Sequence, residues 1–108
     1  MPTTRKKRSK EAQTAPRAAP LEQVLKSLSE PLRLSIVRQL LASEGEEIAC
    51  GGFEHCLTKA TFSHHIAILE KAGLVQARAD GTRRLISLRR EHLARHFPGL
   101  IELIRRAP

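Results

Sequence analysis

The segment TKATFSHHIAILEKAG, which begins at Thr58 and ends at Gly73, contains the signals of one amphipathic helix. Thr58 is of a residue type that caps helix N-termini, and Gly73 is of the type that most often follows a helix C-terminus. Between them, Phe62, Ile66 and Leu69 recur at three- and four-residue spacing and predict one buried face. A helix with a single apolar face requires other elements to pack against that face.

Two further helices are predicted upstream of this segment. Residues 21–28 place leucine and valine at helical spacing, and residues 30–42 carry a second apolar stripe. We expect Ser29 to cap the second of these helices and Pro31 to lie in its first turn. The segment IACGGFEHC that follows has two glycines and little periodicity, so it predicts at most a short helix.

A β-hairpin is predicted after Gly73. In LVQARADGTRRLISL, β-branched and apolar residues flank Asp80-Gly81, a dipeptide typical of tight turns, although the pattern does not determine the register. A helical C-terminal segment follows, interrupted at Pro98-Gly99. The order helix, helix, short helix, helix, hairpin, helix predicts a winged helix-turn-helix, a mainly α fold with a small β-hairpin.

The composition favours one small domain with an aliphatic core. The chain has 108 residues, of which only 3% are aromatic, and it contains no Trp and no Tyr. A core built from Leu, Ile, Val and Ala favours helix packing. Residues 1–19 lack apolar periodicity, so we expect them to form a disordered basic tail, with the domain in residues 20–108.

The charge of the chain indicates a polyanionic partner. The formal net charge is +8, but residues 1–20 contribute +5 of it and the remainder only +3. This excess of positive charge favours nucleic acid as the partner, but it does not establish nucleic-acid binding. No run approaches the roughly 18 apolar residues that span a membrane, and two cysteines cannot form a disulfide framework. We therefore expect a cytoplasmic protein without a membrane partner.

The polar residues of the predicted helix at 58–72 point in different directions. At about 100° per residue, His64 faces away from the apolar stripe, whereas His65 lies at its edge, so the two cannot chelate one ion together. Small and polar side chains at a helix N-terminus suit base edges, and arginines around a hairpin tip suit phosphates. The expected DNA contacts are Thr58, Lys59, Ala60, Thr61, Ser63, His64, His65, Arg78, Arg83 and Arg84.

Other roles for these residues remain open. The arginines would also serve as a solvated strand edge, His64 as an ordinary exposed residue, and His65 as a partly buried structural residue. A catalytic role for Ser63 and His64 is not expected, because these sequence neighbours diverge and no acid orients the imidazole. We therefore predict no catalytic residue and no enzyme.

Three stretches, LSEPLRLSIVRQLL, TKATFSHHIAILEKAGLV and ADGTRRLISL, together resemble the ArsR family of bacterial winged-helix repressors. The resemblance covers roughly residues 21–90. It implies a homodimer that binds a palindromic operator in double-stranded DNA, contacts its partner through the first and last helices, and is released by an inducer. The residues that match the family pattern are Glu30, Pro31, Arg33, Thr61, Ser63, His65, Leu69, Ala72, Gly73, Leu74, Val75 and Gly81.

Terminal apolar stripes without a partner in the chain favour the same dimer. The expected interface residues are Leu21, Val24, Leu25, Leu28, Leu100, Ile101, Leu103 and Ile104. Two other functions remain as alternatives: a winged-helix protein-interaction module, and a small metal-handling protein that uses Cys50 and Cys56.

The two cysteines allow three interpretations. Members of the family that sense thiophilic metals carry Cys-x-Cys before the recognition helix, but here Gly52 stands where the second thiol would be. Cys50 and Cys56 are therefore ordinary thiols, or a redox or persulfide switch, or ligands of a metal ion or arsenical together with His55. No cofactor is certain, and a metal ion or a thiol modification remains possible.

The last helical segment carries a further, weaker pair of candidate metal ligands. His92 and His96 are one helical turn apart, but the metal-binding pattern of the family is incomplete around them. They would either share an ion with a symmetry mate or belong to a solvated helix face.

Overall fold

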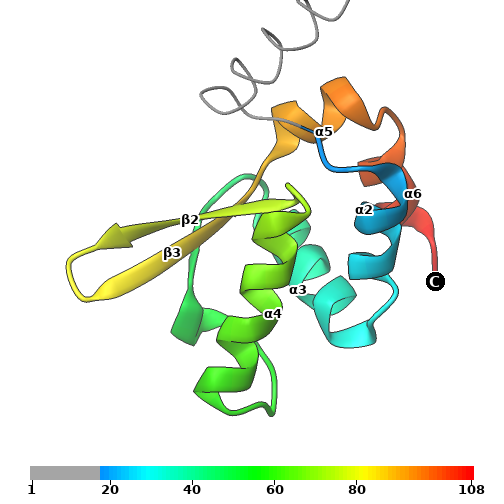
Figure 1. Ribbon diagram of the computed structural model, residues 1–108. Coiled ribbons are helices and arrows are strands. Elements are labelled where there is room, and N and C mark those ends of the chain that lie inside the picture. The colour runs from blue at the N-terminus through cyan, green and yellow to red at the C-terminus, as the bar shows by residue number, and fades with distance from the viewer. Residues whose placement is uncertain (1–17) are drawn as a thin grey trace, which may run out of the picture.

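The structure, a computed structural model, describes residues 18–108. The tail expected over residues 1–19 lies almost entirely outside this range. Helices surround one end of a small antiparallel sheet, and a long hairpin projects from the body (Figure 1). The elements are α2 (Leu21–Leu28), α3 (Pro31–Ala42), β1 (Ile48–Ala49), a 3-10 turn (Cys50–Gly52), α4 (Lys59–Lys71), β2 (Val75–Asp80), β3 (Arg83–Leu88), α5 (Arg90–His96) and α6 (Leu100–Arg106).

The predicted winged helix-turn-helix is confirmed, and α4 has the expected ends. Thr58 caps α4, because its hydroxyl oxygen accepts a hydrogen bond from the backbone N–H of Thr61 at 3.2 Å. Gly73 follows the helix with a φ of 78°, a backbone conformation that side chains with a Cβ rarely adopt. The break in the C-terminal helices is also confirmed, since Gly99 separates α5 from α6 with a φ of 92°.

The cap predicted for α3 is wrong. Ser29 has a helical backbone and ends α2, because its hydroxyl donates to the carbonyl of Lys26 at 2.7 Å. The extended residue before α3 is Glu30, whose carboxylate accepts from the N–H of Leu32 at 3.1 Å. Only Ser29 and Glu30 separate the two helices, and Glu30 caps α3 because it alone of the two has the required extended conformation. Pro31 occupies the first turn, as predicted.

The β2–β3 hairpin, which we call the wing, has a two-residue loop. The register runs from Val75 opposite Leu88 to Asp80 opposite Arg83, so the loop consists of Gly81 and Thr82. The predicted turn at Asp80-Gly81 is therefore displaced by one residue, because Asp80 still belongs to the ladder. Gly81 begins the loop with a φ of 65°, which explains the need for glycine there.

A third strand, β1, was not predicted. Ile48 and Ala49 pair with Ile86 and Leu85 of β3, which gives the strand order β1-β3-β2. Two residues are too few for a period-two alternation to be recognised, so the sequence predicted only a short helix here. The 3-10 turn that follows β1 matches that weaker prediction.

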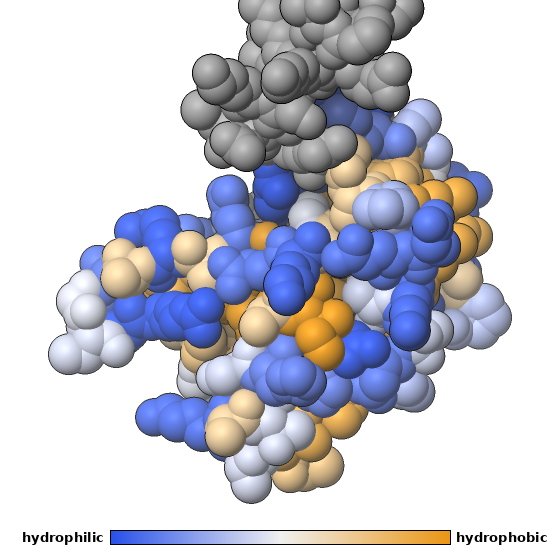
Figure 2. All heavy atoms as spheres, viewed as in Figure 1, coloured by the Kyte–Doolittle hydropathy of each residue, from blue (hydrophilic) through white to orange (hydrophobic). Residues whose placement is uncertain are grey.

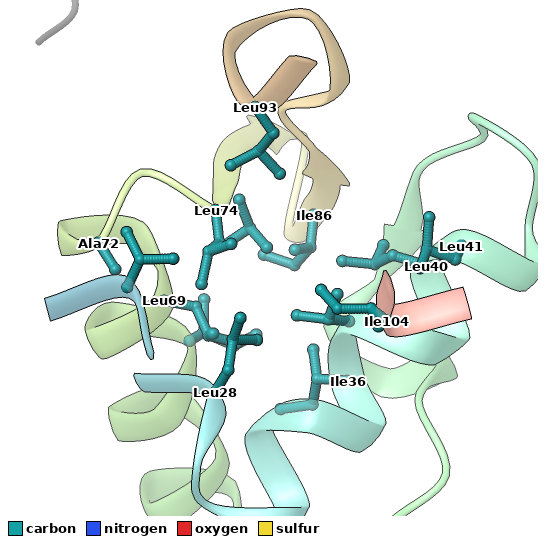
Figure 3. Close-up of a cluster of buried hydrophobic side chains, with 14 of the residues drawn as sticks. Leu28, Ile36, Leu40, Leu41, Leu69, Ala72, Leu74, Ile86, Leu93 and Ile104 are labelled. Carbon is teal, nitrogen blue, oxygen red and sulfur yellow. The ribbon is translucent and has the colours of Figure 1, made fainter. Parts of the chain in front are cut away.

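The hydrophobic core is aliphatic, as the composition predicts. Among its largest fully buried side chains are Leu40 of α3, Leu69 of α4, Ile86 of β3 and Leu93 of α5. Figure 3 shows these residues converging from different elements on one region between the helices and the base of the wing. The core therefore holds α4 and the wing in a defined relative position.

The eight residues expected at a dimer interface divide into two groups. Four of them belong to the core of the protomer: Val24, Leu28, Leu100 and Ile104 are at most 9% exposed. The expectation that these four side chains contact a dimer partner is corrected, because they are buried within the protomer itself. Leu21, Leu25 and Leu103 are 53%, 49% and 61% exposed, and Ile101 is half-buried.

The sequence did not separate the two groups because α2 and α6 are apolar on more than one side. Figure 2 shows hydrophobic atoms at the surface over α2 and α6. Among residues 18–108, no helix is both long and apolar enough to cross a membrane.

Candidate nucleic-acid interface

The N-terminal half of α4 presents a row of small and polar side chains to solvent. We call Lys59, Ala60, Thr61, Ser63 and His64 the reading face; all are exposed except Ser63, which is half-buried. Thr58 precedes it, and its hydroxyl donates to that of Thr61 at 2.9 Å. The opposite side of α4 buries Phe62, Ile66 and Leu69, none more than 2% exposed. The core therefore determines which side of the helix faces outward.

Aromatic packing fixes the beginning of α4. Phe62 lies against Phe53 with ring centroids 5.3 Å apart, and His55 stacks on Phe62 at 4.2 Å. The Nδ1 atom of His55 accepts a hydrogen bond from the N–H of Leu57 at 3.0 Å. His55, a candidate metal ligand in the sequence, thus packs against α4, the expected recognition helix, and holds the loop that leads into it.

His64 and His65 have separate environments, as helical geometry predicts. His64 is exposed, whereas the side chain of His65 is only 13% exposed. The Nδ1 atom of His65 lies 3.1 Å from a guanidinium nitrogen of Arg33, which can only donate, so Nδ1 accepts. The Nε2 atom lies 3.9 Å from the carboxylate of Glu30, and Arg33 also donates to the carbonyl of Ser27. His65 therefore joins α4 to α3.

Each wing arginine has a carboxylate partner. Two nitrogens of Arg78 donate to the two oxygens of Glu47 at 2.7 Å each. Arg83 pairs with Asp80 at 3.0 Å across the hairpin loop. Sequence reasoning missed these partners, because it did not determine the hairpin register that places Arg83 opposite Asp80.

The remaining wing arginine is joined to the recognition helix. Arg84 of β3 pairs with Glu70 of α4 at 3.2 Å. Nothing in the sequence indicated this pair, because the two residues lie on different elements. All three arginines of the wing have side chains at least 46% exposed, so solvent reaches each ion pair.

The hydrogen bonds of the Arg78–Glu47 pair shift the pKa of each side chain in the direction that favours its charged form. The hydrogen bond from Arg78 lowers the pKa of Glu47, and the same bond raises the pKa of Arg78. This pair attaches the wing to the loop before β1.

A cleft of about 600 Å³ lies between the recognition helix and the wing. Lys59 and Ser63 line it from α4, Arg83 and Arg84 line it from the wing, and Cys50 lines it from the 3-10 turn. The structure thus brings predicted DNA contacts from two elements to one hollow. Arg78 is not among the lining residues, since it lies nearer the base of the wing.

The predicted metal ligands do not form a cluster. Cys50 is half-buried, Cys56 is exposed, and both are free thiols. The rings of His92 and His96 approach to 4.6 Å, and they line a different hollow from the one that Cys50 lines. Over residues 18–108, no group of three or more His, Cys, Asp or Glu side chains is arranged to hold a metal ion.

Comparison with known proteins identifies the family. A family model described as a helix-turn-helix domain matches residues 28–76, which include α3, α4 and the start of the wing. The HTH-type transcriptional regulator YceK of Bacillus subtilis is 38% identical over 84 residues, which cover 76% of this chain and 83% of the relative. The arsenical resistance operon repressor of Staphylococcus xylosus is 39% identical over 74 residues, or 68% of this chain and 69% of the repressor.

The chain belongs to the ArsR family of winged helix-turn-helix transcriptional regulators.

The fold of this ArsR-type chain is also that of a solved repressor. The crystal structure of the transcriptional repressor BigR from Xylella fastidiosa matches with a TM-score of 0.61 and 24% identity, covering 93% of this chain and 91% of BigR. The relatives and the family model confirm the predicted function as a DNA-binding transcriptional regulator.

Proposed function

We propose that this ArsR-type regulator is a cytoplasmic homodimeric repressor that binds operator DNA through the reading face and the wing. The observation that carries the proposal is one cleft lined by Lys59 and Ser63 of the reading face and by Arg83 and Arg84 of the wing. Recognition helices present their N-terminal residues to the major groove, while flanking cations contact phosphates. Repression is the activity named for the Staphylococcus xylosus and Xylella fastidiosa relatives.

Individual side chains have distinct roles in this proposal. Thr61, Ser63 and His64 donate to base edges or phosphates, and Ala60 permits close approach of the helix backbone to the groove. Lys59 and the hydroxyl of Thr58 contact the backbone at the start of the helix. His65 contributes indirectly, because its bond to Arg33 holds α4 against α3.

The ion pairs of the wing determine how its arginines engage DNA. Arg83 and Arg84 are bonded to Asp80 and Glu70 in the free protein, so a DNA phosphate must share or replace a carboxylate. Exposed ion pairs contribute at most about 1 kcal/mol, so the exchange costs little. The Arg84–Glu70 pair therefore orients the wing before binding, and neither pair prevents phosphate contact.

The proposed dimer uses the exposed apolar residues of the terminal helices. Leu21 and Leu25 lie one turn apart on α2, and Leu103 and Ile101 belong to α6. The three leucines are each about half exposed or more, which is unusual for large apolar side chains in a small protein. A twofold axis through this surface would present two recognition helices to successive major grooves.

Substitution of Lys59 tests the DNA interface. Lys59→Ala should weaken duplex binding and reduce the slope of log affinity against log salt by about 0.9, the value for one lost phosphate contact. The matched control is Lys26→Ala, which removes an exposed lysine from α2. Unchanged DNA binding in Lys59→Ala, His64→Ala and Arg83→Ala alike would contradict the proposed interface.

A thiol-responsive form of the regulator is a second candidate function, favoured by the position of Cys50 in the wall of the cleft. Alkylation of Cys50 would place a bulky group between the recognition helix and the wing. N-ethylmaleimide should therefore weaken DNA binding by the wild type and by Cys56→Ser but not by Cys50→Ser. Equal loss of binding in the two serine variants would exclude Cys50 as the responsive thiol.

A further inference from the structure

A second cavity, of about 520 Å³, lies between α5 and the base of the wing, and its lining includes three arginines and one acid. Arg89, Arg90 and Arg95 line it together with His92 and His96. It shares no lining residue with the cleft beside the recognition helix. In Figure 1, α5 lies at the end of the wing that is remote from the hairpin loop. This cavity is therefore separate from the proposed reading site.

The charges in this cavity are not compensated. Among residues 18–108, no carboxylate lies within ion-pairing distance of Arg89, Arg90 or Arg95. Within the part of the chain that the structure describes, Glu91 is the one acid that lines the cavity, and it is exposed. The opposite arrangement holds on the wing and α6, where five arginines pair with carboxylates: Arg78, Arg83, Arg84, Arg105 and Arg106.

Two of the cavity arginines are positioned by contacts that leave most of their donors unused. One nitrogen of Arg90 donates to the carbonyl of Leu40 at 3.3 Å. One nitrogen of Arg89 lies 3.4 Å from Nδ1 of His92. A guanidinium carries five N–H donors in a planar fork, so each retains donors for a ligand. Anchored guanidinium groups with free donors are suited to planar, bidentate contact with oxyanions.

His92 connects this cavity to the end of the recognition helix. Its Nε2 atom is buried and has no hydrogen-bond partner within residues 18–108. The same atom would lie 3.2 Å from a Cβ placed at Gly73, directly after α4. Burial lowers the pKa of His92, and the charges of Arg89, His96 and Arg95 lower it further. The ring of His92 therefore lies in the positive electrostatic potential of these side chains. A ligand bound in the cavity would experience the same potential.

We propose that this cavity binds a phosphoryl group, with Arg89, Arg90 and Arg95 as its donors. Three guanidinium groups favour an anion over a metal cation in this cavity. The volume exceeds that of a lone phosphate and falls in the range of small-ligand sites, about 300–1,000 Å³. The phosphoryl group belongs either to a free phosphorylated small molecule or to the DNA backbone that flanks the operator.

Pyrophosphate binding to the full chain in the absence of DNA tests the site directly. Isothermal titration at constant ionic strength should show saturable binding by the wild type and a loss of about tenfold or more in Arg95→Gln. Arg95 is exposed, so its replacement should preserve the fold, which a circular-dichroism melt verifies. Arg106→Gln is the matched control, because Arg106 lies on α6 and pairs with Glu102 at 3.0 Å.

Binding that is absent in the wild type, or equally strong in Arg95→Gln and wild type, would overturn the proposal for a free phosphorylated ligand. A second arm then compares a short duplex with one extended by a helical turn at each end. Weaker binding of Arg95→Gln to the extended duplex alone assigns the phosphoryl group to DNA. If Arg95→Gln changes neither measurement, the proposal is wrong. A failure of the reading-face variants would not affect the pyrophosphate result, so the two proposals are tested separately.

Discussion

Arg84 of β3 lies 3.2 Å from the carboxylate of Glu70 in α4, so an ion pair joins the wing to the recognition helix. The side chains are 46% and 35% exposed, which places the pair at the surface of the proposed interface. The pair adds little to stability, because solvent screens it. The pair matters because it orients the wing relative to α4. It also places the negative charge of Glu70 beside the proposed DNA site.

Removal of that negative charge should strengthen DNA binding. Glu70→Gln frees Arg84 for a phosphate, so affinity should rise and the slope against log salt should steepen by about 0.9. Fluorescence anisotropy at several salt concentrations measures both quantities. Glu102→Gln is the control, because it raises the net charge equally on α6, away from the reading face. An equal gain in both variants would show that bulk charge alone is responsible.

Truncation of Phe62 should destabilise the domain. Phe62 is 2% exposed and contacts the rings of Phe53 and His55. Phe62→Ala should therefore lower the free energy of unfolding by about 3–5 kcal/mol. His64→Ala, on the exposed side of the same helix, should change it by less than about 0.5 kcal/mol. Urea denaturation compares the two variants, and similar values would contradict the described orientation of α4.

A side chain at Gly73 should destabilise the domain. Its φ of 78° is unfavourable for alanine, and a Cβ would approach Nε2 of His92 to 3.2 Å. Gly73→Ala should cost at least about 1 kcal/mol of unfolding free energy. Gly51→Ala is the matched control, because a Cβ at Gly51 meets no atom within 4 Å. Thermal denaturation of the two variants separates backbone strain from a general effect of added methyl groups.

His92 should make stability depend on pH. Its pKa in the folded chain lies below the ordinary value of 6.5, because of burial and of the nearby cations Arg89, His96 and Arg95. The unfolded chain then binds the proton more readily, so stability should fall as the pH drops below about 6.5. His92→Gln should reduce this dependence, whereas His64→Gln should retain it. Urea midpoints between pH 8 and 5 provide the test, and identical profiles for His92→Gln and wild type would contradict it.

The proposed dimer should be sensitive to a charge on its apolar contact surface. Leu103 is 61% exposed in the isolated chain, so Leu103→Glu should leave the protomer folded but shift sedimentation toward the monomer. Leu93, only 1% exposed, offers a contrast, since Leu93→Glu should prevent folding itself. A monomeric wild type at micromolar concentration would refute the dimer.

The sequence predicted the elements whose signals are local. The cap at Thr58, the stop at Gly73 and the stripe on α4 depend on residues within one helix, and all three are confirmed. The divergence of His64 and His65 also follows from helical geometry alone. The family motif indicated the function as well, because the residues that carry it lie in a few continuous segments of the chain.

The remaining features depend on long-range contacts or on competition between neighbours. Ser29 and Glu30 are both able to cap a helix, and the end of α2 decides between them. The Glu47–Arg78 and Glu70–Arg84 pairs join different elements and leave no periodic trace. The burial of Val24 could not be distinguished from the exposure of Leu25, because both occur at helical spacing.

The eight-residue helix α2 has a consequence for how the regulator responds to its own abundance. One side of α2 is held by the protomer through Val24 and Leu28, while Leu21 and Leu25 are left for the proposed partner. A helix this short is marginal by itself. On dilution the dimer would lose contacts that also keep α2 ordered, so subunit number and protomer stability would decline together. The fraction of operator that is occupied would then depend on the protein concentration that synthesis and degradation maintain.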